Sequence, residues 1–388
     1  MSLPRLTREF VEDYRTRRID GVTIPADNQF DLPEKVLQFG SGRLLRGFTD
    51  YFIDKANRNG VFGGRVVIVQ STGSRRSEIL NAQDGMFTVC IQGLEDGEPV
   101  QRYEVLSSVS RAIPARQDWE SVLEVARAPE LSVVVSNTTE VGIRLDRDDR
   151  LDRNPPSSYP GKLTAVLYER YEEFSGAEDR GLVIVPTELI EKNGDELKRI
   201  VVELAEIWEL GADFIQWIDE ANEFCNSLVD RIVTGRPEQD ELEERWQTLG
   251  FRDELLTIAE VYRLWAIQGS AATRARLSFG ETDEGVIITD DISPYRERKV
   301  RILNGAHTIS VPTAYLAGEE TVLDMMRNGH TEAFVEGVML DEIVPTLNVD
   351  PTSAVDFARE VLDRFRNPYL EHLLIDITFQ ESTKMRHR

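Results

Sequence analysis

Cysteine, histidine and lysine are scarce in this chain of 388 residues. It contains two cysteines, Cys90 and Cys225, and four histidines. Two cysteines are too few for a disulfide framework, and the cysteines and histidines lack the spacing of metal ligands, so we expect neither a disulfide scaffold nor a bound metal ion. Seven lysines stand against 38 arginines. A lysine in an apolar segment is therefore an unusual feature of this chain.

Long apolar runs are also missing from the sequence. None approaches the roughly 18 consecutive residues that a membrane-spanning helix needs. The amino-terminal residues lack the apolar core of a signal peptide. We therefore expect a cytoplasmic protein with no membrane partner.

Acidic residues outnumber basic ones so far that the formal net charge at pH 7 is −24. A surface of this sign repels polyanions, which argues against a nucleic-acid partner. The acids are dispersed, for example over residues 146–149 and 238–244, and they form no acidic tail. An anionic small molecule would need a locally basic site on such a protein.

Apolar β-branched runs alternate with amphipathic stretches, a pattern typical of an α/β protein with a parallel sheet. The predicted strands are residues 36–39, 66–70, 131–135, 182–185 and 286–288, with a hairpin insertion at 87–91 and 103–106. A helix is predicted over residues 44–56, and four more over 295–317, 319–328, 331–345 and 352–366. Pro312 should kink or end the first of these four. Two domains follow, residues 1–290 and a mostly helical part over 291–388.

The first predicted strand ends in Gly40-Ser41-Gly42 and is followed by a helix. This is the place where a dinucleotide pyrophosphate meets backbone N–H groups, and Arg43 could add a cation. The second strand ends at Gln70 and not at the acid that usually holds the adenosine ribose. Ser71 or Ser74 with Arg75 could accommodate a 2′-phosphate, or these residues form an ordinary loop. NAD and NADP both stay open on these residues.

Polar residues follow the next two predicted strands, where ligands bind in an open α/β sheet. Asn137 and Glu140 are candidates for the nicotinamide side, and the alternative is a turn that caps the next element. Glu188 and Asn193 fall at the same edge of the sheet. Asp230 lies in a dense polar stretch near Cys225, which indicates either a site lining or a solvated helix face.

Lys299, Asn304 and His307 stand in a segment otherwise rich in apolar residues. On an α-helix, with Lys299 at 0°, His307 falls at about 80° and Asn304 at about 140°, so all three share one broad face. Loss of solvation would lower the pKa of the lysine toward the range useful for proton transfer. The alternative is a surface lysine beside a histidine that is satisfied in the core.

Basic residues gather in the stretch Arg364–Pro368 of this acidic chain. Arginine pairs with a carboxylate through two parallel hydrogen bonds, so Arg364 is a candidate for an acidic substrate. The alternative is a salt bridge to a neighbouring acid.

These stretches together resemble the long-chain mannitol dehydrogenase family, and within it most of all the tagaturonate reductases (altronate oxidoreductases). The resemblance runs in order over nearly the whole chain. It rests on residues 37–48, 81–85, 135–143, 214–217, 224–233, 290–307 and 364–368.

The resemblance implies a Rossmann-type nicotinamide-binding domain followed by a mostly α-helical domain, with the site in the cleft between them. It implies metal-independent hydride transfer between NAD, with NADP not excluded, and a sugar acid, interconverting D-tagaturonate and D-altronate in hexuronate breakdown. Lys299 would be the general acid and base, Asn304 would stabilise the alkoxide and His307 would orient the substrate oxygen. The expected cofactor-binding residues are Phe39, Gly40, Gly42, Arg43, Ser71, Asn137 and Glu140. The expected substrate-binding residues are Glu188, Asn193, Asp230 and Arg364.

Three departures from the family pattern qualify these expectations, and the first weakens a mannitol assignment more than a uronate one. Leu189 replaces an oxyanion-stabilising asparagine of the polyol members, Glu297 lies two residues before the lysine and not three, and the chain stops at Arg388 where relatives continue. A truncated helical domain is one expectation. Fructuronate reductase and mannitol-type polyol dehydrogenase are the nearest alternatives, and a non-catalytic nucleotide-binding protein is the alternative from another class. The oligomeric state cannot be read from the sequence.

Overall fold

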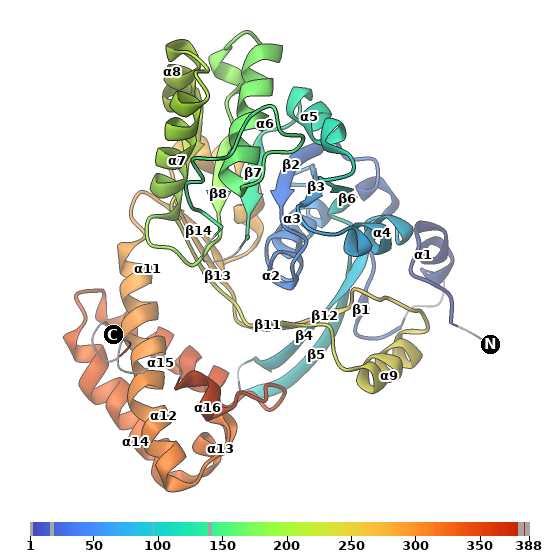
Figure 1. Cartoon of the computed structure of the whole chain (residues 1–388). Helices are drawn as coiled ribbons and strands as arrows, with labels where there is room; N and C mark the ends of the chain where they lie inside the picture. The colour runs from blue at the N-terminus through green and yellow to red at the C-terminus, as the bar shows by residue number, and fades with distance from the viewer. Residues whose placement is uncertain (1–2, 16–18, 96, 139–141, 379–383, 385–388) are drawn as a thin grey trace. The chain divides into compact units, whose positions relative to one another are not determined.

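The computed structural model describes residues 3–15, 19–95, 97–138, 142–378 and 384. The chain forms two compact units, coloured by residue number in Figure 1. Unit 1 comprises Met1–Cys90, Arg102–Ala259 and Arg263–Asp290, and unit 2 comprises Ile91–Gln101, Glu260–Tyr262 and Asp291–Arg388. Unit 2 thus takes in two short segments that lie far from its main part in the sequence.

A six-stranded parallel sheet organises unit 1, with the strand order β6-β3-β2-β7-β8-β9. Its strands are β2 (Glu34–Phe39), β3 (Arg65–Gln70), β6 (Val109–Pro114), β7 (Val133–Ser136), β8 (Val183–Pro186) and β9 (Glu223–Phe224). The chain winds outward in one direction from β2 and in the other from β7, so the order reverses between these two strands. This is the doubly wound topology, and it confirms the predicted Rossmann-type fold of the first part of the chain.

Apolar side chains explain why these segments form the central strands. Every residue of β3, β7 and β8 is buried, as expected for parallel strands that are covered on both faces. One apolar cluster joins the sheet to the helices around it. These helices are α5 (Trp119–Arg127), α6 (Tyr159–Glu173), α7 (Asn193–Ile207) and α8 (Ala212–Ala221), which can be followed in Figure 1.

Two smaller sheets complete the β structure. The order β10-β13-β14 joins β10 (Ser227–Asp230), β13 (Leu264–Gln268) and β14 (Val286–Thr289). The order β1-β5-β4-β12-β11 joins β1 (Val22–Thr23), β5 (Glu98–Leu106), β4 (Phe87–Glu95), β12 (Thr257–Glu260) and β11 (Val233–Gly235). The predicted hairpin strands are therefore the neighbours β4 and β5, and β4, β5 and β12 contribute residues to both units.

The helix predicted over residues 44–56 is wrong as a single element, because it is divided into α2 (Arg43–Arg46) and α3 (Thr49–Arg58). The break falls at Gly47 and Phe48. A Cβ on Gly47 would lie 2.9 Å from a methyl carbon of Val233, and its carbonyl accepts a hydrogen bond of 2.6 Å from Arg231 Nη1. The chain from β10 to β11 thus packs into the break, which periodicity within residues 44–56 cannot reveal.

Unit 2 is mostly helical, as predicted, around its own apolar core. Its helices are α11 (Ser293–Arg298), η4 (Lys299–Asn304), α12 (Gly305–Ala317), α13 (Val322–Arg327), α14 (Gly329–Gly337), η5 (Val338–Ile343), η6 (Val344–Thr346), α15 (Pro351–Phe365) and α16 (Leu374–Ile377). The predicted helix over 295–317 contains the π-helical segment η4 between α11 and α12. Pro312 does not end this helix, since α12 continues to Ala317.

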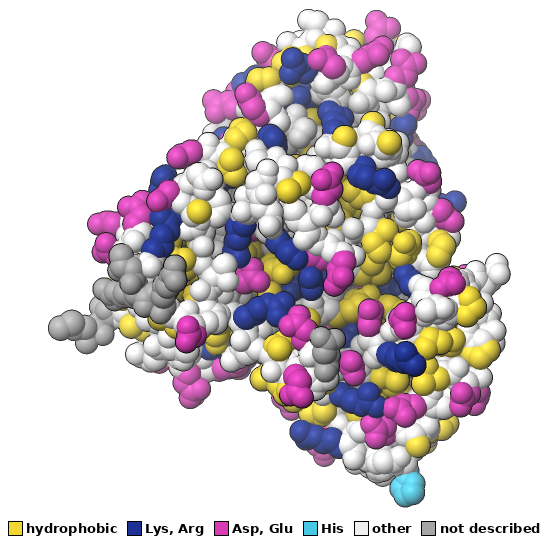
Figure 2. Space-filling view, turned by 180° about the vertical axis from the view of Figure 1, so that it is seen from behind, with side chains coloured by type: hydrophobic (Ala, Val, Ile, Leu, Met, Phe, Trp, Pro, Cys, Tyr) yellow, Lys and Arg dark blue, Asp and Glu magenta, His cyan; other side chains and the backbone are white. Residues whose placement is uncertain are grey.

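The remaining helices of unit 1 lie between the strands or near its amino terminus. They are α1 (Arg8–Tyr14), η1 (Asp27–Gln29), α4 (Arg75–Ala82), η2 (Glu178–Arg180), α9 (Gln239–Leu249), α10 (Ala271–Arg276) and η3 (Ser278–Thr282). No helix in the described ranges combines the length and the apolar character that crossing a bilayer requires. On the face seen in Figure 2, acidic side chains are dispersed among arginines and lysines.

Arg170 of α6 joins this helix to the loop that leads into β7. The side chain is 1% exposed. Its guanidinium donates to the carbonyl oxygens of Arg180, Ala126, Ala128 and Leu131 at 2.6 to 2.9 Å. A buried cation is costly unless its donors are satisfied, and here backbone carbonyls satisfy them.

We predict that Arg170→Met lowers the free energy of unfolding by about 2–4 kcal/mol, because four carbonyls, those of Ala126 and Leu131 in buried hydrogen bonds, lose their donor. Urea unfolding followed by circular dichroism measures the change. Arg147→Met is the matched control, because Arg147 is largely exposed and a surface substitution should change stability by no more than about 0.5 kcal/mol. Equal effects of the two substitutions would contradict a structural role for Arg170.

Candidate functional site

The turn after β2 brings the carboxyl ends of three strands together. The N–H of Gly40 donates to the carbonyl of Val69 at 3.1 Å, and the N–H of Asn137 donates to the carbonyl of Phe39 at 3.1 Å. Gly40 has φ +131°, and a Cβ there would lie 2.8 Å from the Asn137 oxygen and 3.0 Å from Leu45 Cδ1. Only glycine fits this position without displacing the backbone of the neighbouring strand end.

The predicted residues Phe39, Gly42 and Arg43 lie around the same turn. Phe39 is buried, with its ring centroid 5.1 Å from that of Tyr159. A Cβ on Gly42 would meet nothing within 4 Å, so space is open beside its backbone. Arg43 Nη1 donates to the carbonyl of Thr234 at 2.7 Å. The turn therefore has one glycine that packing requires and one that leaves room for a ligand.

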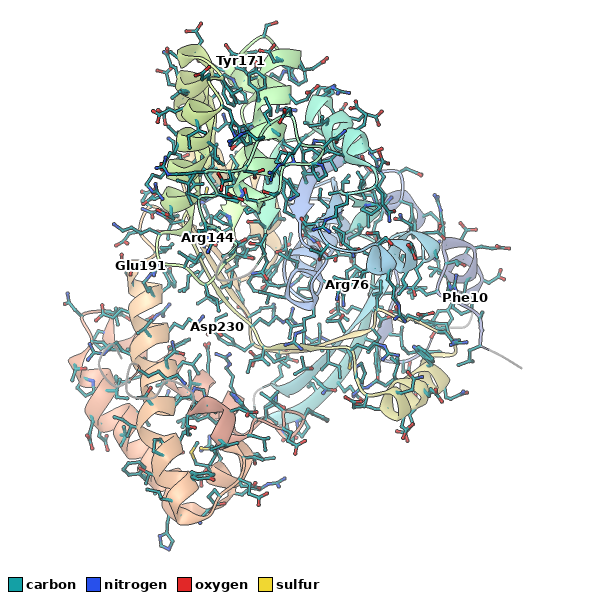
Figure 3. The ribbon with its side chains drawn as sticks, in the orientation of Figure 1. Phe10, Arg76, Arg144, Tyr171, Glu191 and Asp230 are labelled. Atoms are coloured by element: carbon teal, nitrogen blue, oxygen red, sulfur yellow. The ribbon has the colours of Figure 1, made fainter. Side chains whose placement is uncertain are left out.

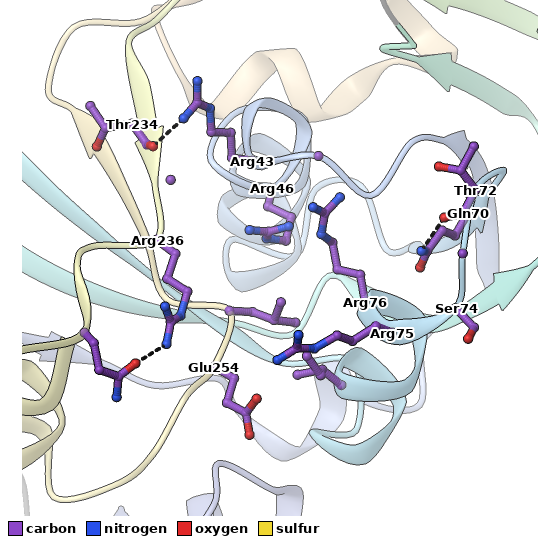
Figure 4. A pocket seen from close by; sticks show the side chains of 16 residues that line it. Arg43, Arg46, Gln70, Thr72, Ser74, Arg75, Arg76, Thr234, Arg236 and Glu254 are labelled. Carbon is purple, nitrogen blue, oxygen red and sulfur yellow. Dashed lines mark hydrogen bonds between the residues drawn. The ribbon is translucent and has the colours of Figure 1, made fainter.

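A pocket of about 1150 Å³ opens beside this turn and the carboxyl end of β3, as Figure 4 shows. All of its lining residues belong to unit 1. Five arginines and one carboxylate line it: Arg43, Arg46, Arg75, Arg76, Arg236 and Glu254. In a chain with a net charge of −24, this is the locally basic site that an anionic ligand requires. A dinucleotide, with its pyrophosphate, is such a ligand.

Arg46 is the buried cation of this pocket, with 4% of its surface exposed. It donates to the carbonyl of Ser41 at 2.7 Å and to Thr257 Oγ1 at 3.0 Å. Burial and then the charge of Arg76 lower the pKa of Arg46 to about 10, against the opposing effect of Asp253 and Asp50. Arg46 thus stays charged at neutral pH next to a second cation.

Gln70 ends β3, where a dinucleotide-binding sheet usually has an acid. Its Nε2 donates to the carbonyl of Thr72 at 2.7 Å, and its Oε1 accepts from the N–H and Oγ of Ser77 at 2.8 and 2.5 Å. The side chain therefore shapes the loop after β3. Ser71, predicted to bind the cofactor, is half-buried and is not among the residues that line the pocket, whereas Ser74 and Arg75 are.

Glu188 follows β8 and holds the chain that follows β7. One carboxylate oxygen accepts from Ser136 Oγ at 3.0 Å, and the other accepts from the N–H and Oγ1 of Thr138 at 2.9 and 3.0 Å. Burial raises the pKa of Glu188, although these hydrogen bonds oppose the rise. Asn137 Nδ2 donates to the carbonyl and Oγ1 of Thr187 at 3.1 Å. Glu140 lies outside the described residues.

Asn193 links β8 to β10 and is fully buried. Its Nδ2 lies 2.9, 3.1 and 3.2 Å from the carbonyl oxygens of Pro186, Glu188 and Ser227, and its Oδ1 accepts from the N–H groups of Gly194 and Ser227. An asparagine side chain has two N–H donors, so backbone groups already engage both. The structure thus gives Asn193 a positioning role, and its direct contact with a substrate stays a prediction.

Asp230 is the last residue of β10 and is labelled in Figure 3. It is buried, with 7% of its surface exposed. The next residue, Arg231, bonds to Gly47 and lies over the ring of Tyr51 at 4.7 Å. The end of β10 is therefore a rigid, polar place, and contact of Asp230 with substrate hydroxyls stays a prediction.

Lys299, Asn304 and His307 lie on one continuous helical run of unit 2, and all three are half-buried. Lys299 begins the π-helical segment η4 and Asn304 ends it. The angles calculated for an α-helix are wrong here, because a π-helix bonds residue i to i+5 and has wider turns. Such segments are frequent at functional sites. Thr308 Oγ1 donates to the carbonyl of Asn304 at 2.8 Å, next to the end of η4.

Two aromatic rings lie beside His307. Its ring centroid lies 4.5 Å from that of Phe365 and 5.7 Å from that of His372. Burial lowers the pKa of His372, and Arg364 lowers it further against the effect of Asp376. His307 is thus held by rings from the segment that also carries Arg364.

Arg364 forms a buried ion pair with Glu260. Its Nε and Nη2 donate to the two carboxylate oxygens at 3.0 and 2.8 Å, and the two side chains are 7% and 4% exposed. The guanidinium also lies over the ring of Tyr262 at 4.2 Å. The carboxylate partner in this structure is therefore Glu260, and binding of a substrate carboxylate by Arg364 stays a prediction.

Several residues of these sites carry no local sequence signal. Long stretches of chain separate Arg236 and Glu254 from most other pocket residues, and Glu260 from its partner Arg364, so that only the fold brings them together. Arg76 directly follows Arg75 in the sequence, and two adjacent arginines after a predicted strand could have indicated that Arg76 also belongs to the basic site. Within the described ranges, no group of three or more His, Cys, Asp or Glu side chains is arranged to hold a metal ion.

The doubly wound sheet and the glycine turn at its switch point are typical of a dinucleotide-binding protein. Comparison with known proteins gives the class, a nicotinamide-dinucleotide oxidoreductase that acts on CH–OH groups. The sequence matches the mannitol dehydrogenase Rossmann domain over residues 34–280 and the mannitol dehydrogenase C-terminal domain over residues 291–388. The chain therefore belongs to the mannitol dehydrogenase family, as its sequence pattern indicated.

Curated relatives extend this similarity. An altronate oxidoreductase of Bacillus subtilis is 44% identical over 362 residues, which cover 93% of this chain and 75% of the relative. An altronate oxidoreductase of Klebsiella pneumoniae is 45% identical over 357 residues, which cover 92% and 74%.

Solved structures support the fold. Mannitol 2-dehydrogenase of Pseudomonas fluorescens, in a ternary complex with NAD and D-mannitol, matches with TM-score 0.75 and 21% identity, covering 96% of this chain and 76% of that one. A D-sorbitol dehydrogenase in substrate-free form matches with TM-score 0.84 and 19% identity, covering 98% and 79%.

Asp50 of α3 provides a test of the buried charges beneath the pocket. Burial raises the pKa of its carboxyl from 3.8 to about 7, against a hydrogen bond from Gln38 and the charge of Arg46. Between these two pKa values the unfolded chain is ionised while the folded chain keeps the proton, so stability falls as pH rises. The loss of folding stability caused by ionising the buried Asp50 is absent below pH 3.8. It reaches its full, constant value above about pH 7.

We therefore predict that Asp50→Asn is increasingly stabilising, relative to the unmodified enzyme, as pH rises from 5 to 8, by up to about 2–4 kcal/mol. Urea unfolding at each pH measures the difference. The exposed residue Asp240 supplies the control, and Asp240→Asn should show no such trend. A difference for Asp50→Asn that is constant or shrinks with pH would refute a raised pKa.

Proposed function

We propose that this enzyme interconverts D-tagaturonate and D-altronate by hydride transfer, using a nicotinamide dinucleotide. The observation that carries the proposal is similarity of 44–45% to altronate oxidoreductases over 92–93% of this chain. Identity of this extent across both units favours a shared substrate class. The glycine turn, the basic pocket and the Lys299 segment provide groups for each part of the reaction.

Residues of unit 1 would hold the dinucleotide. Gly40 and Gly42 let the chain after β2 approach the pyrophosphate, and the arginines of the pocket offset its charge. When bound, the dinucleotide supplies the hydride for reduction and accepts it in the reverse direction. Glu188 keeps the strand ends β7 and β8 in register by its bonds to Ser136 and Thr138.

Lys299 would act as the general acid. In reduction the hydride reaches the carbonyl carbon while the Lys299 ammonium gives a proton to the carbonyl oxygen, and in oxidation the neutral amine takes the proton back. Asn304 would donate a hydrogen bond to the developing alkoxide, the position where a fixed donor lowers the barrier most. His307, packed against the rings of Phe365 and His372, would orient the same oxygen.

Asp230 and Arg364 would bind the parts of the sugar acid that do not react, its hydroxyl groups and its carboxylate. Asp230 is a buried acceptor suited to hydroxyl groups. Arg364 is the candidate for the carboxylate, and to bind it this guanidinium must share or exchange its contact with Glu260. Fructuronate reductase and a mannitol-type polyol dehydrogenase remain alternatives that differ in the substrate alone, and a non-catalytic nucleotide-binding protein remains the alternative of another class.

A substrate panel tests the proposal. We expect oxidation of NADH or NADPH, followed at 340 nm as is usual for these cofactors, with tagaturonate in preference to fructuronate, and none with fructose. Turnover of fructose and mannitol without any keto-uronate would overturn the substrate assignment. Turnover of fructuronate alone would replace tagaturonate by its epimer.

We predict that Lys299→Ala lowers kcat by about 10²–10⁴-fold, the usual contribution of a general acid. Fluorescence of bound NADH checks that the dinucleotide still binds, because the pocket and Lys299 belong to different units. Lys198→Ala is the matched control, since Lys198 pairs with Asp219 on the surface of unit 1. Unchanged turnover in Lys299→Ala would remove this lysine from the mechanism.

A further inference from the structure

The basic pocket lies where a doubly wound sheet holds the adenosine ribose of a dinucleotide. Its lining includes Gln70 and the loop that follows β3, and β3 is the neighbour of the first strand β2. In sheets of this order the residue at the end of that second strand faces the ribose hydroxyls. The groups around this point therefore decide whether a 2′-hydroxyl or a 2′-phosphate is preferred.

No carboxylate stands at the end of β3. An acid there accepts hydrogen bonds from the ribose hydroxyls of NAD and repels the 2′-phosphate of NADP. Gln70 takes its place, and this side chain is turned back to Thr72 and Ser77. The usual determinant of NAD preference is thus missing at its usual position.

Arg75 and Arg76 bring positive charge to the same place. Neither forms an ion pair with any residue that the structure describes. The nearby acid Glu78 accepts a hydrogen bond of 2.6 Å from Ser74 Oγ. Arg76 donates to Ser41 Oγ at 3.3 Å, and its charge acts unfavourably on Arg46. Several guanidinium groups thus gather here, and an anion would stabilise them.

Arg236 adds a cation from a distant part of the sequence, just after β11. Its Nη2 donates to Gln239 Oε1 at 2.7 Å, a neutral partner that leaves its charge uncompensated. Figure 4 shows the guanidinium groups of Arg75 and Arg236 pointing into the pocket. Two segments far apart in the chain therefore present cations to one space.

We propose that Arg75, Arg76 and Arg236 bind the 2′-phosphate of NADP(H), so that this enzyme takes NADPH in preference to the NADH that its family resemblance implies. The inference rests on the proposed function, because it concerns the dinucleotide of the same reductase. A phosphate monoester carries close to two negative charges at neutral pH. Guanidinium groups match its oxygens through paired, charge-assisted hydrogen bonds.

Glu254 is the group that argues for NAD, because it is the one carboxylate among the lining residues. It is half-buried, and its carboxylate could accept hydrogen bonds from ribose hydroxyls. Against it stand five arginines. Arg75 and Arg76 lie on the same side of the pocket as the loop after β3, and Arg236 lies across from them (Figure 4). The balance of charge favours the phosphate.

The test compares two adenosine fragments that differ in the 2′-phosphate alone. Isothermal titration calorimetry on the whole chain should show that adenosine 2′,5′-bisphosphate binds ~10- to 100-fold more tightly than 5′-AMP, as expected for charge-assisted hydrogen bonds. In the double variant Arg75→Ser/Arg236→Ser, the ratio of the two affinities should fall until the fragments differ by no more than about threefold. Arg147→Ser, an exposed arginine outside the pocket, should keep the original ratio.

Three results would overturn the inference. The first is equal affinity for the two fragments in the unmodified chain. The second is binding of inorganic phosphate as tight as that of the bisphosphate, which would indicate an unspecific anion site. The third is a loss of 5′-AMP affinity in Glu254→Gln, which would assign the ribose hydroxyls to Glu254. We expect Glu254→Gln instead to increase the ratio of the affinity for adenosine 2′,5′-bisphosphate to that for 5′-AMP.

Because the fragments need no sugar acid, this inference and the proposed function fail separately. A high ratio in a protein that turns over no keto-uronate would refute the function and keep the phosphate site. Turnover of tagaturonate with a ratio near one would keep the function and refute the phosphate site. Comparing kcat/KM for NADPH and NADH with the active substrate then provides the second readout.

Discussion

The close approach of Gly40 to the carbonyl of Asn137 is the constraint on which the nucleotide-binding edge depends. With no Cβ at position 40, the ends of β2 and β7 can lie side by side, and the backbone bonds of Gly40 and Asn137 tie in β3 as well. The strand order reverses at this point, so two loops diverge there and leave space between them. The pocket opens beside this contact, and Glu188 holds the chain that follows β7 next to it.

Local concentration of charge is the second theme of the molecule. Acids dominate its composition, yet five arginines converge on one pocket. In unit 2 the buried cation Arg364 is instead neutralised by an acid, because it forms a buried ion pair with Glu260. Within the described part of the chain, Arg75, Arg76 and Arg236 of the pocket form no ion pair, whereas the buried Arg364 has Glu260 as its partner.

The sequence predicted the strands well because buried parallel strands are continuous apolar runs, as in β3, and their order follows from the Rossmann pattern. It predicted the helix divided at Gly47 poorly, because the break depends on contacts with Val233 and Arg231 from a distant segment. The glycine turn and Lys299 could be singled out from residue type and spacing. Arg236 and Glu260 could not, because only tertiary folding brings them to their partners, and no rule of spacing anticipates the π-helical segment.

That segment has a consequence for how the enzyme tolerates changes of length. A π-turn contains an additional residue compared with an α-turn, so removal of one residue between Lys299 and Asn304 would let the run close as a regular α-helix. Because the wider π-turn already accommodates the additional residue, the part of the helix after the deletion would keep about the same orientation relative to the part before it. The side chains between Lys299 and Asn304 would be the ones that change direction. Insertions and deletions are commonly absorbed in loops, but here a wider helical turn, with Lys299 at its start and Asn304 at its end, absorbs one residue inside a helix.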